Sequence, residues 1–107
     1  MGIATRLGEL TAKARQGKLE LHELKGGTFT ITNHGVSGSL IATPVINQPQ
    51  SAVLGIGKIE KRVVVGERDS LEIKPMVYVT LTIDHRALDG FQANSFLTRF
   101  VDALQEW

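Results

Sequence analysis

Residues 77–90 read VYVTLTIDHRALDG, and this stretch decides the fold class. Its first half alternates aliphatic side chains with tyrosine and threonine, a period of two that predicts a β-strand with one dry face and one face of hydroxyl groups. The second half, residues 84–90, sets a histidine between two aspartates and ends in glycine, which is typical of a turn. A fixed scaffold presents reactive side chains at such strand ends, so His85 is the first candidate for chemistry.

Helical periodicity appears on both sides of this region. From Phe91 onward apolar residues recur every three or four positions, and Asp89 is well placed as the N-cap of this helix. Residues 3–16 show the same spacing, and Gly17 follows as the expected C-cap. A helix is therefore predicted before and after the strands.

The segment between the two helices is rich in strand patterns. Residues 28–32 alternate with period two, which puts Phe29 and Ile31 on one face and three threonine hydroxyls on the other. Residues 51–59 are predicted as a buried strand, and residues 62–65 either continue it or pair with it across a short turn. The order of helix, several strands and helix predicts an α/β fold.

Charge is distributed unevenly along the 107 residues, although the net charge is only +1. No Asp, Glu, Lys or Arg occurs between Lys25 and Lys58, where only His34 can become charged. An exposed segment of that length usually carries charges, so we expect much of it to be buried in the core or in a subunit contact. The alternative is a flexible linker, which the embedded strand patterns disfavour.

Composition excludes several classes of function. The near-neutral charge balance gives no cationic field for nucleic acid or an anionic membrane, and no apolar run is long enough to span a bilayer. No signal peptide is visible at the start of the sequence. Without cysteine the chain has no disulfide framework, no thiolate nucleophile and no Cys-based zinc site.

The turn that follows the best strand supports two interpretations. Asp84 or Asp89 can fix the tautomer and orientation of the His85 imidazole, as a general base requires. In the alternative, Asp89 only caps the following helix and Asp84 pairs with Arg86, which leaves the histidine as an ordinary turn residue. Spacing alone does not decide between them.

The motif DHRALDG resembles the D-H-R-x-x-D-G signature of the dihydrolipoamide acyltransferases, the E2 components of 2-oxo acid dehydrogenase complexes. The stretches GGTFTITN, ATPVINQPQSAVLGIG and IEKR, and residues 75–78, also resemble that family in the family's order. The resemblance runs from about Gly17 to the C-terminus. It implies a mixed-sheet, CoA-dependent acyltransferase fold like that of chloramphenicol acetyltransferase, of which residues 1–107 are the C-terminal portion of one catalytic domain.

The resemblance also implies a mechanism, the transfer of an acyl group between the thiols of dihydrolipoamide and coenzyme A. His85 matches the family's general base, which takes the proton of the attacking thiol. Thr32 matches the hydroxyl that stabilises the oxyanion of the tetrahedral intermediate. Asp89 matches the second acidic residue of the motif and is expected to hold the geometry of the site. Three further residues are expected to support the site structurally: Asp84, Arg86 and Gly90.

Partners follow from the same resemblance. The family's active site lies between subunits of a trimer, so we expect a homo-oligomer, either a trimer or a trimer-based cage. Coenzyme A is expected as a substrate, the lipoyl group on a separate or missing domain, and no metal. Residues 1–107 contain no lipoyl domain and no peripheral-subunit-binding domain, so contacts with the lipoyl domain and the E1 and E3 components are assigned to missing regions. Nucleic acid and membranes are not expected partners, and the expected compartment is bacterial or archaeal cytoplasm or the mitochondrial matrix.

Several alternatives stay open. The chain can be a catalytically incompetent fragment that acts as an oligomeric structural core, or an acyltransferase with a non-lipoyl acceptor. The acyl group can be acetyl, succinyl or branched-chain, with INQPQSAVLG favouring a succinyl or broad-specificity member. His34, beside Thr32, is interpreted as a turn residue that tolerates unusual backbone angles rather than as a catalytic group. A metal site built from the three histidines fits no compact ligand pattern, and no role is assigned to His22.

Overall fold

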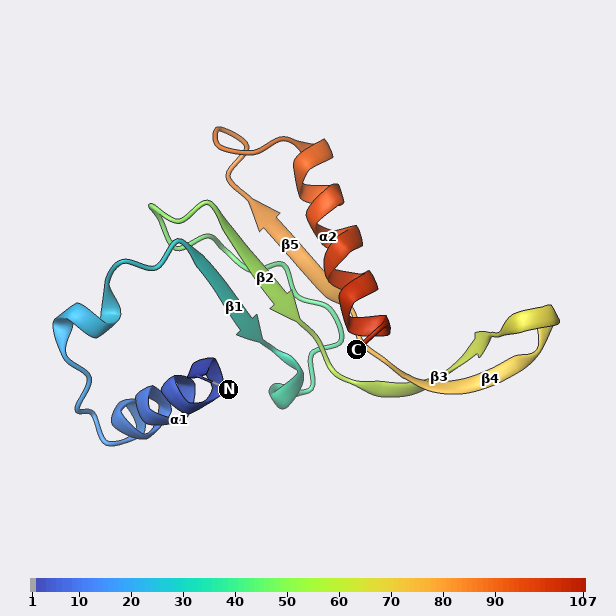
Figure 1. Cartoon of the computed structure of the whole chain (residues 1–107), viewed down its shortest axis with the longest axis horizontal. Helices are drawn as coiled ribbons and strands as arrows, with labels where there is room; N and C mark the ends of the chain where they lie inside the picture. Colours follow the sequence, from blue (N-terminus) through green and yellow to red (C-terminus); the bar gives the residue numbers. More distant parts are fainter. Residues whose placement is uncertain (1) are drawn as a thin grey trace.

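The central sheet of the molecule has three strands in the order β1–β2–β5 (Figure 1). A computed structural model describes residues 2–107, with β1 at Phe29–Asn33, β2 at Ala52–Ile56 and β5 at Val79–Ile83. β1 runs parallel to β2, and β5 runs antiparallel to β2. The predicted α/β fold with a mixed sheet is therefore confirmed.

The two faces of this sheet differ in chemistry, because residues paired across strands point to the same side. The register aligns Thr32 with Gly55 and Gly55 with Thr80, and the neighbouring row on the same face pairs Thr30 and Thr82 with Val53. We call this side the hydroxyl face. Its residues on the three strands are Thr30, Thr32, Val53, Gly55, Thr80 and Thr82.

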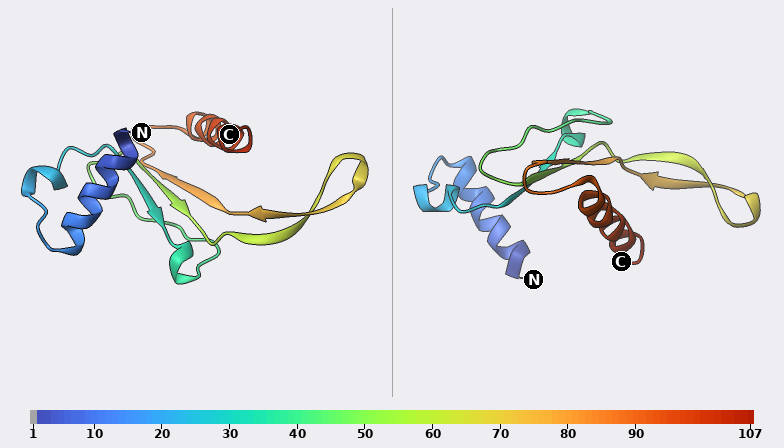
Figure 2. Two further views of the ribbon diagram at one scale, coloured as in Figure 1. Left: turned by 60° about the horizontal axis from the view of Figure 1, so that its bottom comes forward. Right: turned by 90° about the horizontal axis from the view of Figure 1, so that it is seen from above.

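The opposite, apolar face is covered by α2, which spans Gly90–Gln105. The ring of Phe96 on this helix lies 5.7 Å from the ring of Phe29 in β1 and 6.3 Å from that of Phe100. Figure 2 shows α2 on one side of the sheet and the connection between β1 and β2 on the other. The strand β2 is thus covered on both faces, and its residues Ala52, Val53 and Leu54 form the buried apolar core.

The predicted N-cap of α2 is confirmed. Asp89 Oδ1 accepts a hydrogen bond from the backbone N–H of Gln92 at 2.8 Å, and the Gln92 carboxamide oxygen accepts one from the Asp89 N–H at 3.1 Å. This reciprocal pair is a capping box, which satisfies backbone donors that the first helical turn leaves without partners. It fixes the start of α2 at Gly90, directly after the turn that begins at Asp84.

Residues 62–65 form a separate strand, so both sequence expectations for them are wrong. They belong to β3 (Glu60–Val65), which pairs antiparallel with β4 (Leu71–Met76) in a two-stranded hairpin. The strand β4 was not predicted, because its partner lies across the turn at residues 66–70 rather than in the central sheet. Figure 2 shows this hairpin projecting away from the helices and the central sheet.

The tip of the hairpin holds two non-glycine residues in the left-handed region. Arg68 has φ 57° and ψ 35°, and Asp69 has φ 60°. Hairpin turns with two positive φ values favour Asn-Gly, because side chains with Cβ atoms are strained there. The turn of this protein therefore stores strain that a better turn sequence can remove.

Replacing Arg68 by Asn together with Asp69 by Gly is expected to stabilise the protein by about 1 kcal/mol, since both new residues accept positive φ. In a domain of this size that corresponds to a rise in Tm of roughly 4–8 °C. Calorimetry of the double variant measures it. Glu67→Asn, a change in the same turn at a residue without positive φ, is the control, and an equal rise in that variant contradicts the explanation.

The chain alone is extended and leaves much apolar surface uncovered. Its radius of gyration is 16.7 Å, whereas a compact domain of this length has about 13 Å. One face of the hairpin carries four exposed aliphatic residues: Val63, Val65, Leu71 and Ile73. The predicted burial of the uncharged segment is confirmed for residues 52–55, whereas Val36 and Val45 are 89% and 90% exposed in the single chain. For these two residues the alternative of a subunit contact remains a prediction.

The predicted first helix is confirmed as α1 (Gly2–Arg15), and Gly17 ends it with φ 69° and an N–H bond to the Ala14 carbonyl at 3.1 Å. Its apolar side is not buried, since Ile3 and Leu7 are 86% and 63% exposed. Charge rather than apolar packing holds α1 to the short helix η1 (Leu21–Leu24).

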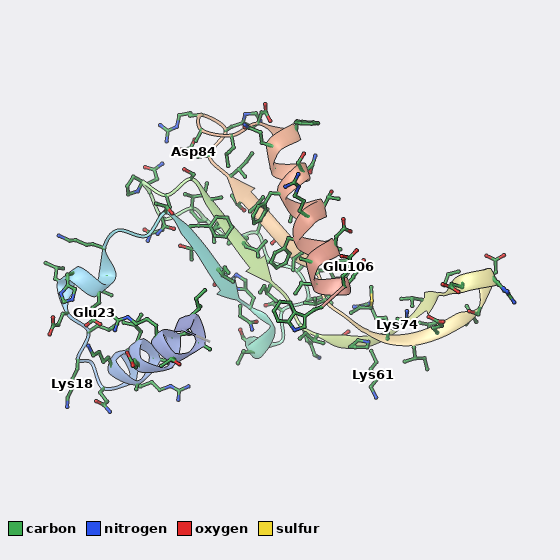
Figure 3. The ribbon with its side chains drawn as sticks, viewed as in Figure 1. Lys18, Glu23, Lys61, Lys74, Asp84 and Glu106 are labelled. Atoms are coloured by element: carbon green, nitrogen blue, oxygen red, sulfur yellow. The ribbon has the colours of Figure 1, made fainter. Side chains whose placement is uncertain are left out.

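The carboxylate of Glu23 in η1 makes that attachment (Figure 3). It accepts a hydrogen bond from Lys13 Nζ at 3.2 Å and lies 3.6 Å from the Arg6 guanidinium, while its side chain is only 1% exposed. The backbone N–H of Glu20 donates to the same carboxylate, and this bond, followed by that of Lys13, lowers the pKa of Glu23 below its ordinary 4.5. A lowered folded-state pKa stabilises the fold above pH 4.5, and this stabilisation is lost as the pH falls through the folded value.

We therefore expect Glu23→Gln to release α1, because Lys13 loses its anionic partner in η1 and Arg6 keeps only Glu9, which lies on α1 itself. Amide exchange in α1 should accelerate at neutral pH, and acidification of the wild type below pH 4.5 should have the same effect. Glu9→Gln, which removes only an exposed partner of Arg6, is the control. Slow exchange in Glu23→Gln, equal to that of the wild type, would contradict the role of this carboxylate.

Candidate active site

The turn that carries His85 is anchored to the sheet by backbone hydrogen bonds. The N–H of Asp84 donates to the Ser51 carbonyl at 2.8 Å, which ties the turn to the start of β2. The carbonyl of Asp84 accepts bonds from Ala87 and Leu88 at 2.9 and 3.0 Å, which closes the turn. His85 therefore projects from a short, internally bonded loop between β5 and α2.

The carboxylate of Asp84 is occupied entirely by Arg86. Its Oδ1 accepts from both the backbone N–H and Nε of Arg86 at 3.0 Å, and its Oδ2 accepts from the guanidinium at 2.8 Å. The side-chain hydrogen bond from Arg86 is the main cause that lowers the pKa of Asp84 from 3.8 to about 2. This ion pair, the Asp84–Arg86 clamp, consequently stays ionised near neutral pH. Both carboxylate oxygens of Asp84 face Arg86, and within residues 2–107 no hydrogen bond joins them to the imidazole.

The His85 imidazole is exposed and forms no hydrogen bond within residues 2–107. Asp89 uses one carboxylate oxygen on the N-terminus of α2, as the alternative interpretation of the turn expected. Neither flanking aspartate therefore fixes the tautomer of His85 inside one chain. If an anion or dipole orients this ring, it comes from another molecule.

Thr32 lies near the end of β1 on the hydroxyl face and is half-buried. Its hydroxyl forms no hydrogen bond within the described part of the chain, whereas the hydroxyls of Thr30 and Thr80 on the same face are both engaged. A threonine hydroxyl without a partner on a partly covered surface is available to donate to a ligand.

The segment after Thr32 is bonded tightly to the end of β2. The N–H of His34 donates to the Ile56 carbonyl at 2.8 Å, and Asn33 Oδ1 accepts from the N–H of Gly35 at 2.8 Å, at the start of the short helix η2 (Gly35–Ser37). His34 directly precedes η2 with φ −95° and ψ −10°, so it is a turn residue, as interpreted from the sequence, and its φ is negative. Its Nε2 is buried and has no hydrogen-bond partner among residues 2–107.

The C-terminal ends of β1 and β5 lie at opposite ends of the central sheet (Figure 1), and Thr32 lies near the first of them whereas the turn with His85 follows the second. The register puts Thr32 level with Thr80, two strands away. From there β5 runs roughly 10 Å further to Ile83 before the turn begins, at about 3.3 Å per residue. Figure 3 shows Asp84 at the far end of β5, beside the start of β1 rather than its end. One chain therefore does not bring the imidazole and the hydroxyl together.

Two other features of the surface lie away from these residues. A groove of about 310 Å³ between β5 and the end of α2 is mainly apolar and contains none of the predicted site residues. Glu20, His22 and Glu23 have ligand atoms within 4.8 Å of one another, the group within residues 2–107 that could hold a metal ion. Because Glu23 already faces Lys13 and Arg6, its charge is compensated without an ion.

A comparison with protein families identifies the chain. The model of the 2-oxoacid dehydrogenases acyltransferase (catalytic domain) family matches residues 1–107. The chain belongs to this family. Its turn 84–90 and its strand β1 are thus the acyltransferase segments that the sequence motifs indicated.

The relatives of this acyltransferase chain are components of 2-oxo acid dehydrogenase complexes. A dihydrolipoyllysine-residue succinyltransferase component of the 2-oxoglutarate dehydrogenase complex of Rickettsia typhi is 48% identical over 103 residues, which cover 96% of this chain and 26% of that protein. The solved dihydrolipoamide acetyltransferase of Azotobacter vinelandii has a TM-score of 0.88 at 34% identity, over 96% of this chain and 42% of that one. The cubic core of a pyruvate dehydrogenase multienzyme complex has a TM-score of 0.88 at 33% identity, over 96% and 42%.

These values confirm the expected acyltransferase fold. They also show that the chain spans about a quarter of the length of the curated relative and about two fifths of the solved ones. Neither helix within residues 2–107 has the length and apolar character needed to cross a membrane.

Proposed function

We propose that this chain forms part of an acyltransferase that moves an acyl group between the thiol of a dihydrolipoyl group and the thiol of coenzyme A. The observation that carries the proposal is the family match over all 107 residues, with the motif DHRALDG in the turn after β5. Both thiols are substrates, and the proposal requires no metal. Residues 1–107 correspond to the C-terminal portion of one catalytic domain.

His85 is proposed as the general base. A thiol with an ordinary pKa of about 8.5 is mostly protonated near neutral pH, so a neutral imidazole that accepts its proton raises the concentration of the nucleophile. The sulfur then attacks the thioester carbonyl and forms a tetrahedral oxyanion. When that intermediate collapses, the original thiol leaves and recovers the proton from the imidazolium. The ring of His85 is exposed and forms no hydrogen bond with any of residues 2–107, so it is accessible for these transfers.

Thr32 is proposed as the donor to the oxyanion, since its hydroxyl has no hydrogen-bond partner among residues 2–107. The spacing in the Azotobacter vinelandii acetyltransferase supports this pair. That enzyme was investigated for the role of a serine, a histidine and an asparagine in its catalytic mechanism, with the serine 52 residues before the histidine and the asparagine four residues after it. Here Thr32 precedes His85 by 53 residues and Asp89 follows it by four.

Asp89 is proposed to hold the geometry of the site through the start of α2, with Asp84, Arg86 and Gly90 as structural support of the turn. The capping box and the Asp84–Arg86 clamp are the contacts that support these roles. In this scheme the aspartates act on the position of the histidine backbone and do not transfer protons.

The complete site is proposed to form between two copies of the chain, in a trimer or a trimer-based cage. The separation of Thr32 and His85 within one chain supports this arrangement, because only a second molecule can supply the missing partner. The relative that forms a cubic core is a precedent for assembly of this fold. Contacts with a lipoyl domain and with E1 and E3 components are proposed for other parts of the whole protein, which we expect in bacterial or archaeal cytoplasm or in the mitochondrial matrix.

Succinyl is the proposed acyl group, because the stretch INQPQSAVLG and the similarity to a succinyltransferase component agree. A second function, an oligomeric structural core without catalysis, is supported by the short span of the chain, which covers about two fifths of the solved acetyltransferase chains.

The experiment that tests the proposal combines native mass spectrometry with an assay of acyl transfer from succinyl-CoA to free dihydrolipoamide. Oligomers with transfer above the uncatalysed background support the enzyme, and acetyl-CoA as the donor checks the acyl preference. Oligomers without transfer support the structural core. A monomer that transfers acyl groups at the full rate would contradict the site between copies.

A further inference from the structure

The segment between β1 and β2 is fixed to the hydroxyl face by two threonines. The hydroxyl of Thr80 donates to the Ala42 carbonyl at 2.7 Å, and the hydroxyl of Thr30 donates to the carboxamide oxygen of Gln50. The two attachments lie on opposite edges of the sheet, β5 and β1. The intervening chain, residues 42–50, is thereby laid across the face that also carries Thr32.

Gly55 leaves room for this segment to approach the middle of the face. A Cβ atom at this position would lie 2.8 Å from the Thr80 hydroxyl and 3.2 Å from the ring of Pro44. Pro44 is buried, the one buried residue that the structure describes between β1 and β2. Its ring therefore packs over Gly55, in the space that a side chain at this position would occupy. Gly55 lies between Thr32 and Thr80 in their cross-strand row.

Adjacent strands lie about 4.8 Å apart, so a ring over Gly55 is also a wall beside the Thr32 side chain. A ring in this position would restrict the rotamers of the Thr32 hydroxyl and shield one side of it from water. A donor to an oxyanion is effective only when its position is fixed before the reaction. The bond from Thr80 holds the wall, although Thr80 itself lies two strands from Thr32.

We infer that Thr80 is a positioning residue for the Thr32 hydroxyl, acting through the segment Ala42–Pro44. This inference rests on the proposed function, because it assigns Thr80 an effect on the oxyanion step. It makes no claim that Thr80 contacts a substrate. The predicted signature is a loss of kcat with little change in KM, since the wall affects the transition state more than the binding of coenzyme A.

The test replaces Thr80 by Val, which keeps the shape and removes the donor, and by Ser, which keeps the donor. In oligomeric Thr80→Val the amides of Gln50 and Lys58, which donate to the Asn47 and Ser39 carbonyls of this connection, are expected to exchange at least about tenfold faster, since the hydrogen bond that fixes the connection to β5 has been lost. The kcat is expected to fall about 10- to 100-fold, because small displacements of catalytic groups have effects of this size, and KM should stay within about twofold. Thr80→Ser should restore both.

Thr82→Val is the matched control, since Thr82 lies on the same strand and face but its hydroxyl forms no hydrogen bond within residues 2–107. It should change neither exchange nor kcat. Pro44→Ala removes the wall while leaving the bond from Thr80, and it tests the inference if Thr80→Val does not fold. A normal kcat in both Thr80→Val and Pro44→Ala, or unchanged exchange in Thr80→Val, overturns the inference. If the wild-type oligomer shows no transfer, the proposed function fails, whereas a loosened segment without loss of kcat is a failure of the inference alone.

Discussion

Alanine at position 85 is expected to abolish most of the acyl transfer of the assembled protein. Removal of a general base typically lowers the rate by about 10²- to 10⁴-fold, which is the effect we expect for His85→Ala on kcat in the succinyl-CoA assay. The fold should be unaffected, because the His85 side chain is exposed and makes no hydrogen bond in residues 2–107. Native mass and Tm should therefore match those of the wild type.

The pH dependence gives a second readout of the same group. The wild-type rate should rise with pH as the general base loses its proton, and this rise should be absent from His85→Ala. Asp84 cannot cause this rise, since its pKa is about 2 and its clamp with Arg86 is already ionised. His22→Ala, which removes an exposed histidine of η1, serves as the control. Full activity of His85→Ala would exclude the proposed base.

Valine at position 32 is expected to lower kcat by about 10²- to 10³-fold, the usual loss when one donor to an oxyanion is removed. Valine keeps the shape of threonine and the half-buried packing on the hydroxyl face, so stability should change little. Thr32→Ser restores a hydroxyl at the same position and should recover most of the activity. Equal losses in the Val and Ser variants would show that packing, and not the donor, matters there.

A mixture of the two inactive variants tests where the complete site forms. If each site takes Thr32 from one copy and His85 from another, random co-assembly of Thr32→Val with His85→Ala gives about a quarter of the sites both native residues. Activity should then return to about a quarter of the wild-type value after the oligomers are dissociated and reassembled together. Mixing without dissociation is the control. No recovery after co-assembly would place both residues in one chain and contradict the proposal.

Local patterns predicted the helices and the central strands because each element is decided by its own residues. The period of two in residues 79–83, the capping box of Asp89 and the positive φ of Gly17 depend on neighbours within one turn or one strand. The motif of residues 84–90 predicted the family for a similar reason, since the spacing of its charged residues is fixed in the sequence.

Features that depend on distant partners were not predictable in the same way. The strand β4 pairs only with β3, and its alternation of charged and aliphatic residues gave no sign of a separate sheet. The bond from Thr80 to Ala42 joins residues 38 positions apart, and no local pattern indicates it. The ion pairs of Glu23 that hold α1 join residues of two separate helices, and no local pattern indicates them either.

The same sheet carries the Thr32 hydroxyl at one end and the His85 turn at the other. Under the proposed arrangement each copy therefore contributes Thr32 to one site and His85 to another. In a closed ring every half-site is completed by a neighbouring copy, whereas an open linear assembly always leaves one Thr32 half-site and one His85 half-site incomplete. The specific activity would then depend on dilution. Far below the concentration at which three copies assemble, the specific activity should fall with the square of the protein concentration. A site divided in this way makes assembly itself the switch for turnover.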